Sequence, residues 1–237
     1  MIQKFLFNFI VLIFSYLLSA QNTSTTINDE AEVPLYELPQ LLITSSGDKI
    51  NTPSDWEQFR RPEIHSYFAN RVYGIVPGSL DLDEVEVLDI EPAALGGKAV
   101  RKQVKLSFKK GIKSISMHLL IYLPAGKKNS PVFLAYNFKG NHSVNSDPAI
   151  LINGKKQSQL NGEELKKFKT SDRGGRTSRW AIDKMLDAGY GLVTINYNNV
   201  DPDKNDFSDG IHSLFYKAGQ MAPNNNEWGS LSAWAWG

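Results

Sequence analysis

The sequence predicts an α/β protein whose sheet begins with antiparallel strands and continues with parallel ones. Three strand-like segments follow one another between residues 85 and 123, and a glycine separates the last two. Two short apolar runs then flank one helical segment, between residues 131 and 196. The composition, with 41% hydrophobic and 22% charged residues, is typical of a globular protein with a packed core.

The first predicted element is helical and begins behind a cap formed by Ser54 and Asp55. We expect residues 60–62, Arg-Arg-Pro, to break it into two short helices, and Gly74 to end it in a turn. Large apolar side chains recur along it at helical spacing: Trp56, Phe59, Ile64, Phe68, Val72 and Tyr73.

The antiparallel part of the sheet is predicted at residues 85–90, 100–108 and 115–123. In the third segment apolar residues alternate with others, which is the period of two of a strand. Gly111 lies between the second and third segments and indicates a hairpin. The simplest arrangement of these three strands is therefore antiparallel.

The parallel part is predicted at residues 131–137 and 191–196, which are short and almost continuously apolar, as in strands buried on both faces. Residues 179–188 between them are expected to form a helix that stops at Gly189. A strand, a helix and a second strand in this order favour a parallel crossover. A last helix is expected from Trp228.

The charge balance and the lack of cysteine exclude several classes of function. Lys plus Arg number 26 and Asp plus Glu number 25, so the chain lacks the positive charge typical of nucleic-acid binders. The absence of cysteine excludes disulfides, thiol nucleophiles and cysteine-ligated zinc. Four scattered histidines predict no metal site, and we expect no cofactor. Calcium binding by the oxygen-rich residues 198–206 is the less favoured alternative.

The N-terminus is typical of an export signal. Lys4 precedes an apolar run over residues 5–18, and Ala20 ends a small-residue cleavage site. An N-terminal membrane anchor is the alternative, but such an anchor needs roughly 20 apolar residues. We therefore expect a signal peptide at 1–20, a polar leader at 21–50 and a folded domain at 51–237, in a secreted or periplasmic protein with no membrane contact after cleavage.

Several strings, taken in order from Trp56 to the last residue, resemble the glucuronoyl esterases and related acetylxylan-esterase-like proteins, which are α/β hydrolases. They are Arg60-Arg61-Pro62-Glu63-Ile64, Val72-Tyr73-Gly74, Asn137-Phe138-Lys139-Gly140-Asn141-His142, Arg173-Gly174-Gly175-Arg176, Trp180-Ala181-Ile182, Gly189-Tyr190-Gly191, Trp228-Gly229 and Ala233-Trp234-Ala235-Trp236-Gly237. The resemblance implies the N-terminal half of an α/β-hydrolase sheet.

In that family a Gly-x-Ser-Arg-x-Gly turn with the nucleophilic serine would follow, and the acid and the histidine would come later. The chain contains no Gly-x-Ser-x-Gly match, so we assign no catalytic residue and expect a fragment that is inactive alone. We also expect strand 191–196 to lack a neighbour on one side, which would make the chain unstable and prone to aggregation.

The candidate active-site loop implied by the resemblance comprises Phe138, Lys139, Gly140 and Asn141, after the first parallel strand. This is where many α/β hydrolases supply an oxyanion-hole N–H. The alternative is a loop with only a structural role, and His142 is not expected to be the base. The arginines of residues 173–176 are expected to bind carboxylates in a tight turn. Trp228, Trp234 and Trp236 are expected in the core and not on a sugar-stacking platform.

The resemblance thus implies a carboxylic ester hydrolase whose partner is a plant cell-wall polysaccharide ester, of the lignin–carbohydrate or xylan type. An acetylxylan-type esterase fragment and a non-catalytic secreted polysaccharide-binding module are the alternatives. The sequence leaves the oligomeric state open.

Overall fold

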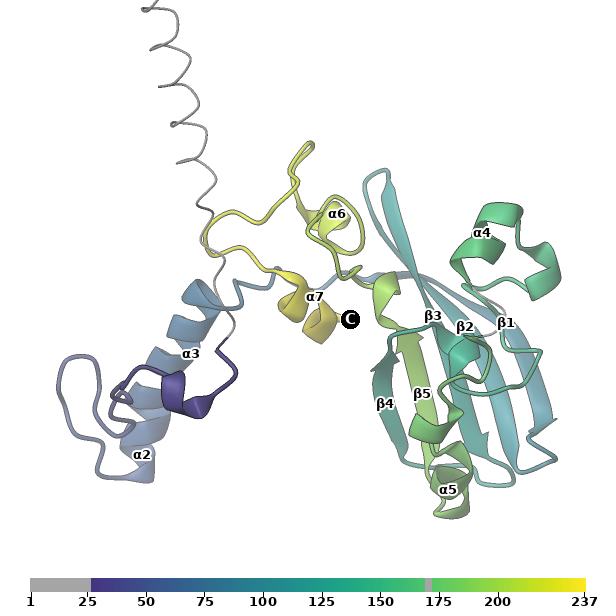
Figure 1. Cartoon of the computed structure of the whole chain (residues 1–237), viewed down its shortest axis with the longest axis horizontal. Helices are drawn as coiled ribbons and strands as arrows, with labels where there is room; N and C mark the ends of the chain where they lie inside the picture. Colours follow the sequence, from purple (N-terminus) through teal and green to yellow (C-terminus); the bar gives the residue numbers. More distant parts are fainter. Residues whose placement is uncertain (1–26, 169–171) are drawn as a thin grey trace, which may run out of the picture. The chain divides into compact units, whose positions relative to one another are not determined.

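The computed structural model describes residues 27–168 and 172–237 (Figure 1). The chain divides into two compact units, Met1–Ile50 and Asn51–Gly237. The predicted signal peptide, residues 1–20, lies outside the described residues. The described part of the first unit contains a 3-10 turn at Glu30–Glu32 and a short bridge between Ile43 and Lys49, and most of its side chains are exposed.

The second unit opens with one continuous helical stretch. Thr52 caps it, since its hydroxyl accepts from the Asp55 N–H at 3.1 Å while the Asp55 carboxylate accepts from the Thr52 N–H at 3.0 Å. The expected cap at Ser54 and the expected break at residues 60–62 are both wrong. Pro62 is the second residue of α3, directly after the π-helical turn Trp56–Arg60, and its fixed φ is compatible with the first turn of an α-helix. The stretch comprises α2 (Pro53–Asp55), a π-helical turn (Trp56–Arg60) and α3 (Arg61–Arg71).

A five-stranded mixed sheet forms the centre of this unit (Figure 1), with spatial order β1-β2-β3-β5-β4. The first three strands and the β3–β5 pair are antiparallel, whereas β4 and β5 are parallel, which confirms the predicted change of direction. The strands are β1 (Leu82–Ala94), β2 (Ala99–Lys110), β3 (Lys113–Pro124), β4 (Val132–Asn137) and β5 (Gly191–Asn196).

The exposed edge of the parallel part is β4, and the expectation of an unpaired edge on β5 is wrong. The crossover through α5 places β5 between β3 and β4, so both sides of β5 are hydrogen-bonded. The prediction that residues 131–137 are buried on both faces is also wrong. Phe133 is 52% exposed and Leu134 is 67% exposed. The apolar sequence of β4 therefore marks an open edge of this structure.

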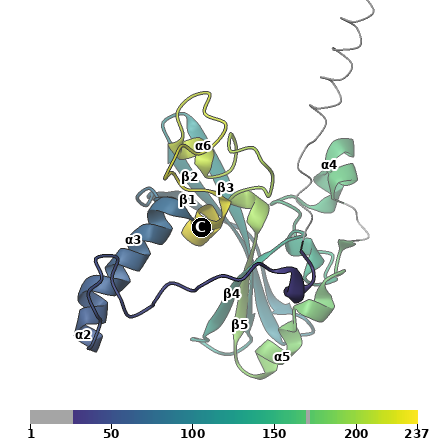
Figure 2. The same ribbon diagram turned by 60° about the vertical axis from the view of Figure 1, so that its left-hand side comes forward.

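Helices cover both faces of the sheet. The remaining α-helices are α4 (Gly162–Lys167), α5 (Ile182–Asp187), α6 (His212–Phe215) and α7 (Ser230–Trp236). Figures 1 and 2 show α5 beside the start of β5 and α6 near the opposite end of the strands. No helix within the described ranges combines the length and the apolar character needed to cross a membrane.

Two apolar clusters follow from the alternation of side chains along β3. Tyr122 and Leu120 face one cluster, with Leu186 of α5, while Met117 faces the other, with Trp228. Trp228 is only 2% exposed, and Trp234 and Trp236 pack against the same cluster, so the prediction that the tryptophans belong to the core is confirmed. The unit is thus built in layers around a sheet with a core on each face.

Candidate active-site loop

The loop predicted from the sequence follows β4 at the carboxyl ends of the two parallel strands. Phe138 and Lys139 are exposed, whereas Gly140 and Asn141 are buried. Asn141 begins a 3-10 turn, Asn141–Ser143. Ligands of open α/β sheets bind outside the carboxyl ends of parallel strands, so the loop lies at the edge where such a ligand is expected.

A network of side-chain amides attaches this loop to three strands. The Asn137 amide donates to the Asn141 side-chain oxygen at 2.7 Å and to the Thr194 hydroxyl of β5 at 3.0 Å. The Asn141 amide donates in turn to the main-chain oxygen of His118 in β3 at 2.8 Å. Because these groups are buried or partly buried, each bond also avoids the cost of an unpaired polar group.

Gly140 is needed for the shape of the turn. Its φ is +88°, in the left-handed region, and a Cβ at this position would lie 2.9 Å from the His142 ring. The Gly140 carbonyl accepts both the Ser143 N–H, at 2.9 Å, and the Ser143 hydroxyl, at 2.7 Å. The loop is therefore a fixed turn whose backbone passes directly against an imidazole.

His142 is 2% exposed, and within the described residues neither ring nitrogen has a hydrogen-bond partner. Burial, followed by the nearby Arg173 guanidinium, lowers the pKa of His142 below its ordinary value. A neutral imidazole without an acidic partner lacks the arrangement of a catalytic base.

Within the described residues, neither arginine of the Arg173-Gly174-Gly175-Arg176 turn forms an ion pair with a carboxylate, contrary to the prediction. Arg173 donates to the main-chain oxygens of Asp147 and Ile150, at 2.9 and 3.0 Å. The Asp147 carboxylate is instead paired with Arg101, which also contacts Asp89 at 2.9 Å. The Asp147 carboxylate thus pairs with Arg101 of β2. Arg173 stabilises the loop by donating hydrogen bonds to main-chain carbonyl groups instead.

A buried Asp201–His212 pair was not predicted. The His212 Nδ1 atom lies 2.8 Å from the Asp201 carboxylate. The Asp201 side chain is 1% exposed and the His212 side chain is 0% exposed. The imidazole is surrounded by aromatic rings. Its centroid lies within 5.0 Å of the ring centroids of Phe207, Tyr216 and Trp228. No pattern in the sequence brings Asp201 and His212 together, since the contact depends on how the 200–212 loop folds back.

The other predicted site features are accounted for by the local structure. His65 is exposed and His118 is half-buried. Within the described residues no three metal-binding side chains come together. Lys204 of the oxygen-rich 198–206 loop lies 3.2 Å from Asp206 and 2.6 Å from Asp209, so a lysine ammonium pairs with these two carboxylates.

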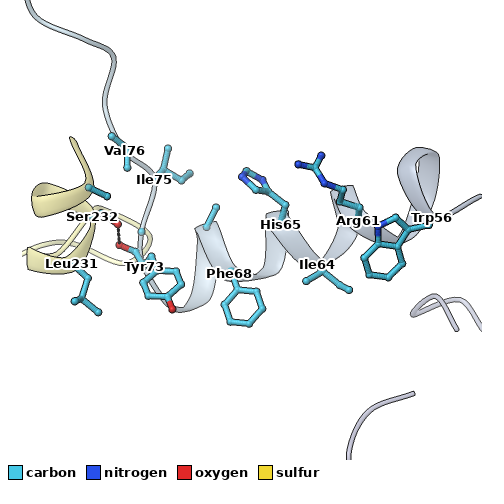
Figure 3. A pocket seen from close by; sticks show the side chains of 13 residues that line it. Trp56, Arg61, Ile64, His65, Phe68, Tyr73, Ile75, Val76, Leu231 and Ser232 are labelled. Atoms are coloured by element: carbon cyan, nitrogen blue, oxygen red, sulfur yellow. Dashed lines mark hydrogen bonds between the residues drawn. The ribbon is translucent and has the colours of Figure 1, made fainter. Parts of the chain in front are cut away.

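Two larger hollows are mainly apolar. One, of about 580 Å³, runs along β4 and includes Phe138, Lys139 and Trp180 in its lining. The other, of about 870 Å³, lies between α3 and α7 (Figure 3). In Figure 3 Arg61 and His65 extend from one side of α3 and Phe68 from the other. Only the first hollow includes residues of the candidate loop.

Comparison with known proteins identifies relatives for most of the chain, although no family model matches it. Carbohydrate esterase MZ0003 from an unknown prokaryotic organism is 39% identical over 215 residues, which cover 88% of this chain and 49% of that protein. The glucuronoyl esterase from Solibacter usitatus superposes with a TM-score of 0.72 at 39% identity, over 87% of this chain and 53% of that one.

A promiscuous CE15 esterase from the marine bacterial metagenome superposes with a TM-score of 0.67 at 38% identity, over 87% of this chain and 52% of that one. The chain therefore spans about half the length of the relatives it matches. Its mixed sheet matches that of the CE15 glucuronoyl esterases, which are α/β hydrolases. Over most of its length, this chain is a homologue of the CE15 glucuronoyl esterases.

Proposed function

We propose that this chain forms part of a carboxylic ester hydrolase that acts on plant cell-wall polysaccharide, in the manner of a glucuronoyl esterase. The observation that carries the proposal is the buried turn at Gly140 and Asn141, fixed at the carboxyl end of β4 in a homologue of such enzymes. Hydrogen bonds from β3, β4 and β5 hold this turn, and a preorganised backbone of this kind can stabilise a developing oxyanion.

The proposed substrate is an ester of a glucuronate group, as in lignin–xylan linkages. An acetylxylan-type ester is the second candidate, because one structural relative is described as promiscuous. Phe138 and Lys139 are the exposed members of the loop and would face the substrate, while Asn141 would act only by holding the turn.

We further propose that the 237 residues alone do not hydrolyse these esters. Acyl transfer by serine needs a base within hydrogen-bond reach of the hydroxyl. In the described part of the chain, no histidine is hydrogen-bonded to a serine hydroxyl, and the sequence holds no Gly-x-Ser-x-Gly turn. We also propose that the protein is exported, with a signal peptide at residues 1–20 and cleavage after Ala20, and that residues 51–237 form the esterase-like domain.

The proposal is tested with a fusion of residues 51–237 to the part of the Solibacter usitatus glucuronoyl esterase that has no counterpart in this chain. We expect the fusion to hydrolyse a glucuronate methyl ester and the 237-residue chain to leave it intact. A folded fusion that binds xylan but cleaves no ester would favour the non-catalytic binding module.

A further inference from the structure

A cavity of about 470 Å³ lies beside the candidate loop, and its lining is strongly polar and mainly cationic. Two lysines and one arginine border it, against a single carboxylate. The lining residues are Lys139, Ser143, Lys167, Asp172, Gly175 and Arg176. Such a concentration of one sign of charge in a concave site raises the local concentration of the opposite ion.

Two hydrogen-bonded loops form the walls of this cavity. The Gly174 N–H donates to the His142 carbonyl and the Arg176 N–H donates to the Ser143 carbonyl, both at 2.9 Å. Gly174 has a φ of +67°, and a Cβ there would lie 2.9 Å from the Ser146 backbone, so the approach of the two loops requires a glycine. Lys139 and Arg176 are thus carried on a shared backbone frame that exists before any ligand binds.

The cations of the cavity form no ion pair with any residue that the structure describes. Among the described residues no carboxylate lies within ion-pair distance of Lys139, Lys167 or Arg176, although lysines elsewhere on the surface have such partners. The Lys167 ammonium lies 5.8 Å from the Phe168 ring centroid, which is at the outer limit of a cation–π contact. The charge of the cavity is therefore available to an anion from outside.

We propose that this cavity binds a free carboxylate on a sugar unit of an acidic polysaccharide, that is, an unesterified uronate. Arg176 supplies the planar fork that suits a carboxylate, and the lysines supply point charges. The cavity shares Lys139, Ser143 and Arg176 with the hollow along β4, whose lining includes the 67% exposed Phe138 ring. A ring beside a cationic pocket matches a ligand with an apolar sugar face and a charged substituent.

The inference rests on the proposed function in one respect only, namely that the polymer that carries the carboxylate is a polysaccharide. It is tested by calorimetric titration of the full chain with trigalacturonate and with neutral xylotriose. At low salt we expect trigalacturonate to bind at least about tenfold more tightly, with the difference shrinking as salt is raised. Because no ester is cleaved in this titration, a failure of the esterase proposal leaves its result unaffected.

Charge variants sharpen the test. Arg176→Ala, Lys139→Ala and Lys167→Ala should each weaken trigalacturonate binding by about tenfold. Asp172→Asn should strengthen it, since the variant removes the one repelling carboxylate. Lys184→Ala on the exposed surface of α5 is the matched control and should change nothing.

Three results would overturn the inference: equal affinity for the charged and neutral trisaccharides, unchanged binding in both Arg176→Ala and Lys139→Ala, or tighter binding of a sulfated trisaccharide. The substituted cations are exposed and Asp172 is half-buried, so the variants should keep the thermal unfolding midpoint of the natural chain. That midpoint is measured on every variant before titration.

Discussion

The side-chain nitrogen of Asn137 lies 2.7 Å from the side-chain oxygen of Asn141, and this hydrogen bond joins the last residue of β4 to the loop that follows it. The same nitrogen also reaches the Thr194 hydroxyl in β5. One amide therefore sets the position of the loop relative to both parallel strands. The conformation of the loop therefore depends on its contacts with the sheet.

Loss of either amide should destabilise the domain. In Asn137→Ala or Asn141→Ala a buried partner is left without its hydrogen bond, which costs about 1–3 kcal/mol of unfolding free energy. Because the two side chains contact each other, the double variant should cost less than the sum of the single ones. Urea unfolding checks this, with the exposed Asn225→Ala as control. Strictly additive losses would show that the Asn137–Asn141 bond contributes nothing.

Gly140→Ala should be more damaging than an alanine at another glycine with a positive φ. Gly126 has a φ of +75° but no atom within 4 Å of the position that a Cβ would take, whereas at Gly140 the His142 ring lies 2.9 Å away. The comparison of Gly140→Ala with Gly126→Ala therefore separates steric contact from backbone strain, which costs about 1 kcal/mol or more on its own. Equal unfolding midpoints for the two variants would contradict the tight packing of the loop.

The folded domain should lose stability in mildly acidic solution. Burial lowers the pKa of both His118 and His142 in the folded state. The unfolded chain, with histidine pKa values near about 6.5, then binds more protons, so the unfolding free energy decreases as the pH falls below that value. Urea midpoints at about pH 7.5 and 5.5 should differ, and His142→Gln should reduce the difference. The exposed His65→Gln is the control. If the difference between the two urea midpoints stayed unchanged in both His118→Gln and His142→Gln, these histidines would not be the source of the pH dependence.

The open edge of β4 should cause self-association at high protein concentration. Exposed apolar strand edges pair with other chains, and an inserted lysine prevents this. Leu134→Lys should therefore keep the protein monomeric in sedimentation velocity, while the natural chain associates. Ile112→Lys, which removes a fully exposed apolar side chain from the β2–β3 turn, should associate as before. A natural chain that stays monomeric at high concentration would show that the edge of β4 does not mediate self-association.

Most of the sheet could be predicted because its strands have clear local patterns. The alternation of residues 115–123 and the apolar run of 191–196 indicated strands close to the observed bounds of β3 and β5. Strand order is set by long-range pairing, so the sequence did not show that β5 is inserted beside β3. Pro62 was misinterpreted since a proline is equally compatible with a helix break and with a first helical turn.

The site was only partly predictable for a similar reason. The resemblance proposes residues 138–141 as the candidate loop, but the groups that fix its conformation include the Asn137 amide of β4 and the Thr194 hydroxyl of β5, and their contacts depend on strand register. The Asp201–His212 pair and the carbonyl partners of Arg173 likewise depend on loop paths that no short sequence pattern encodes.

Export should be visible at the N-terminus of the mature protein. Expression of the whole gene product in a Gram-negative host should release a chain that begins at Gln21, because the charged, apolar and small-residue regions match those cut by signal peptidase. Edman sequencing of the periplasmic fraction checks this. An exported chain that still begins at Met1 would favour an N-terminal anchor.

The central claim is that the turn at Gly140 belongs to the site of a glucuronate esterase. The most direct measurement is kcat/KM for a glucuronate methyl ester in the fusion with the Solibacter usitatus remainder, compared between Gly140→Ala and Gly126→Ala. We predict that Gly140→Ala lowers kcat/KM by about 100-fold or more, as loss of oxyanion stabilisation does, and that Gly126→Ala leaves it unchanged. Full activity of a folded Gly140→Ala fusion would contradict the claim.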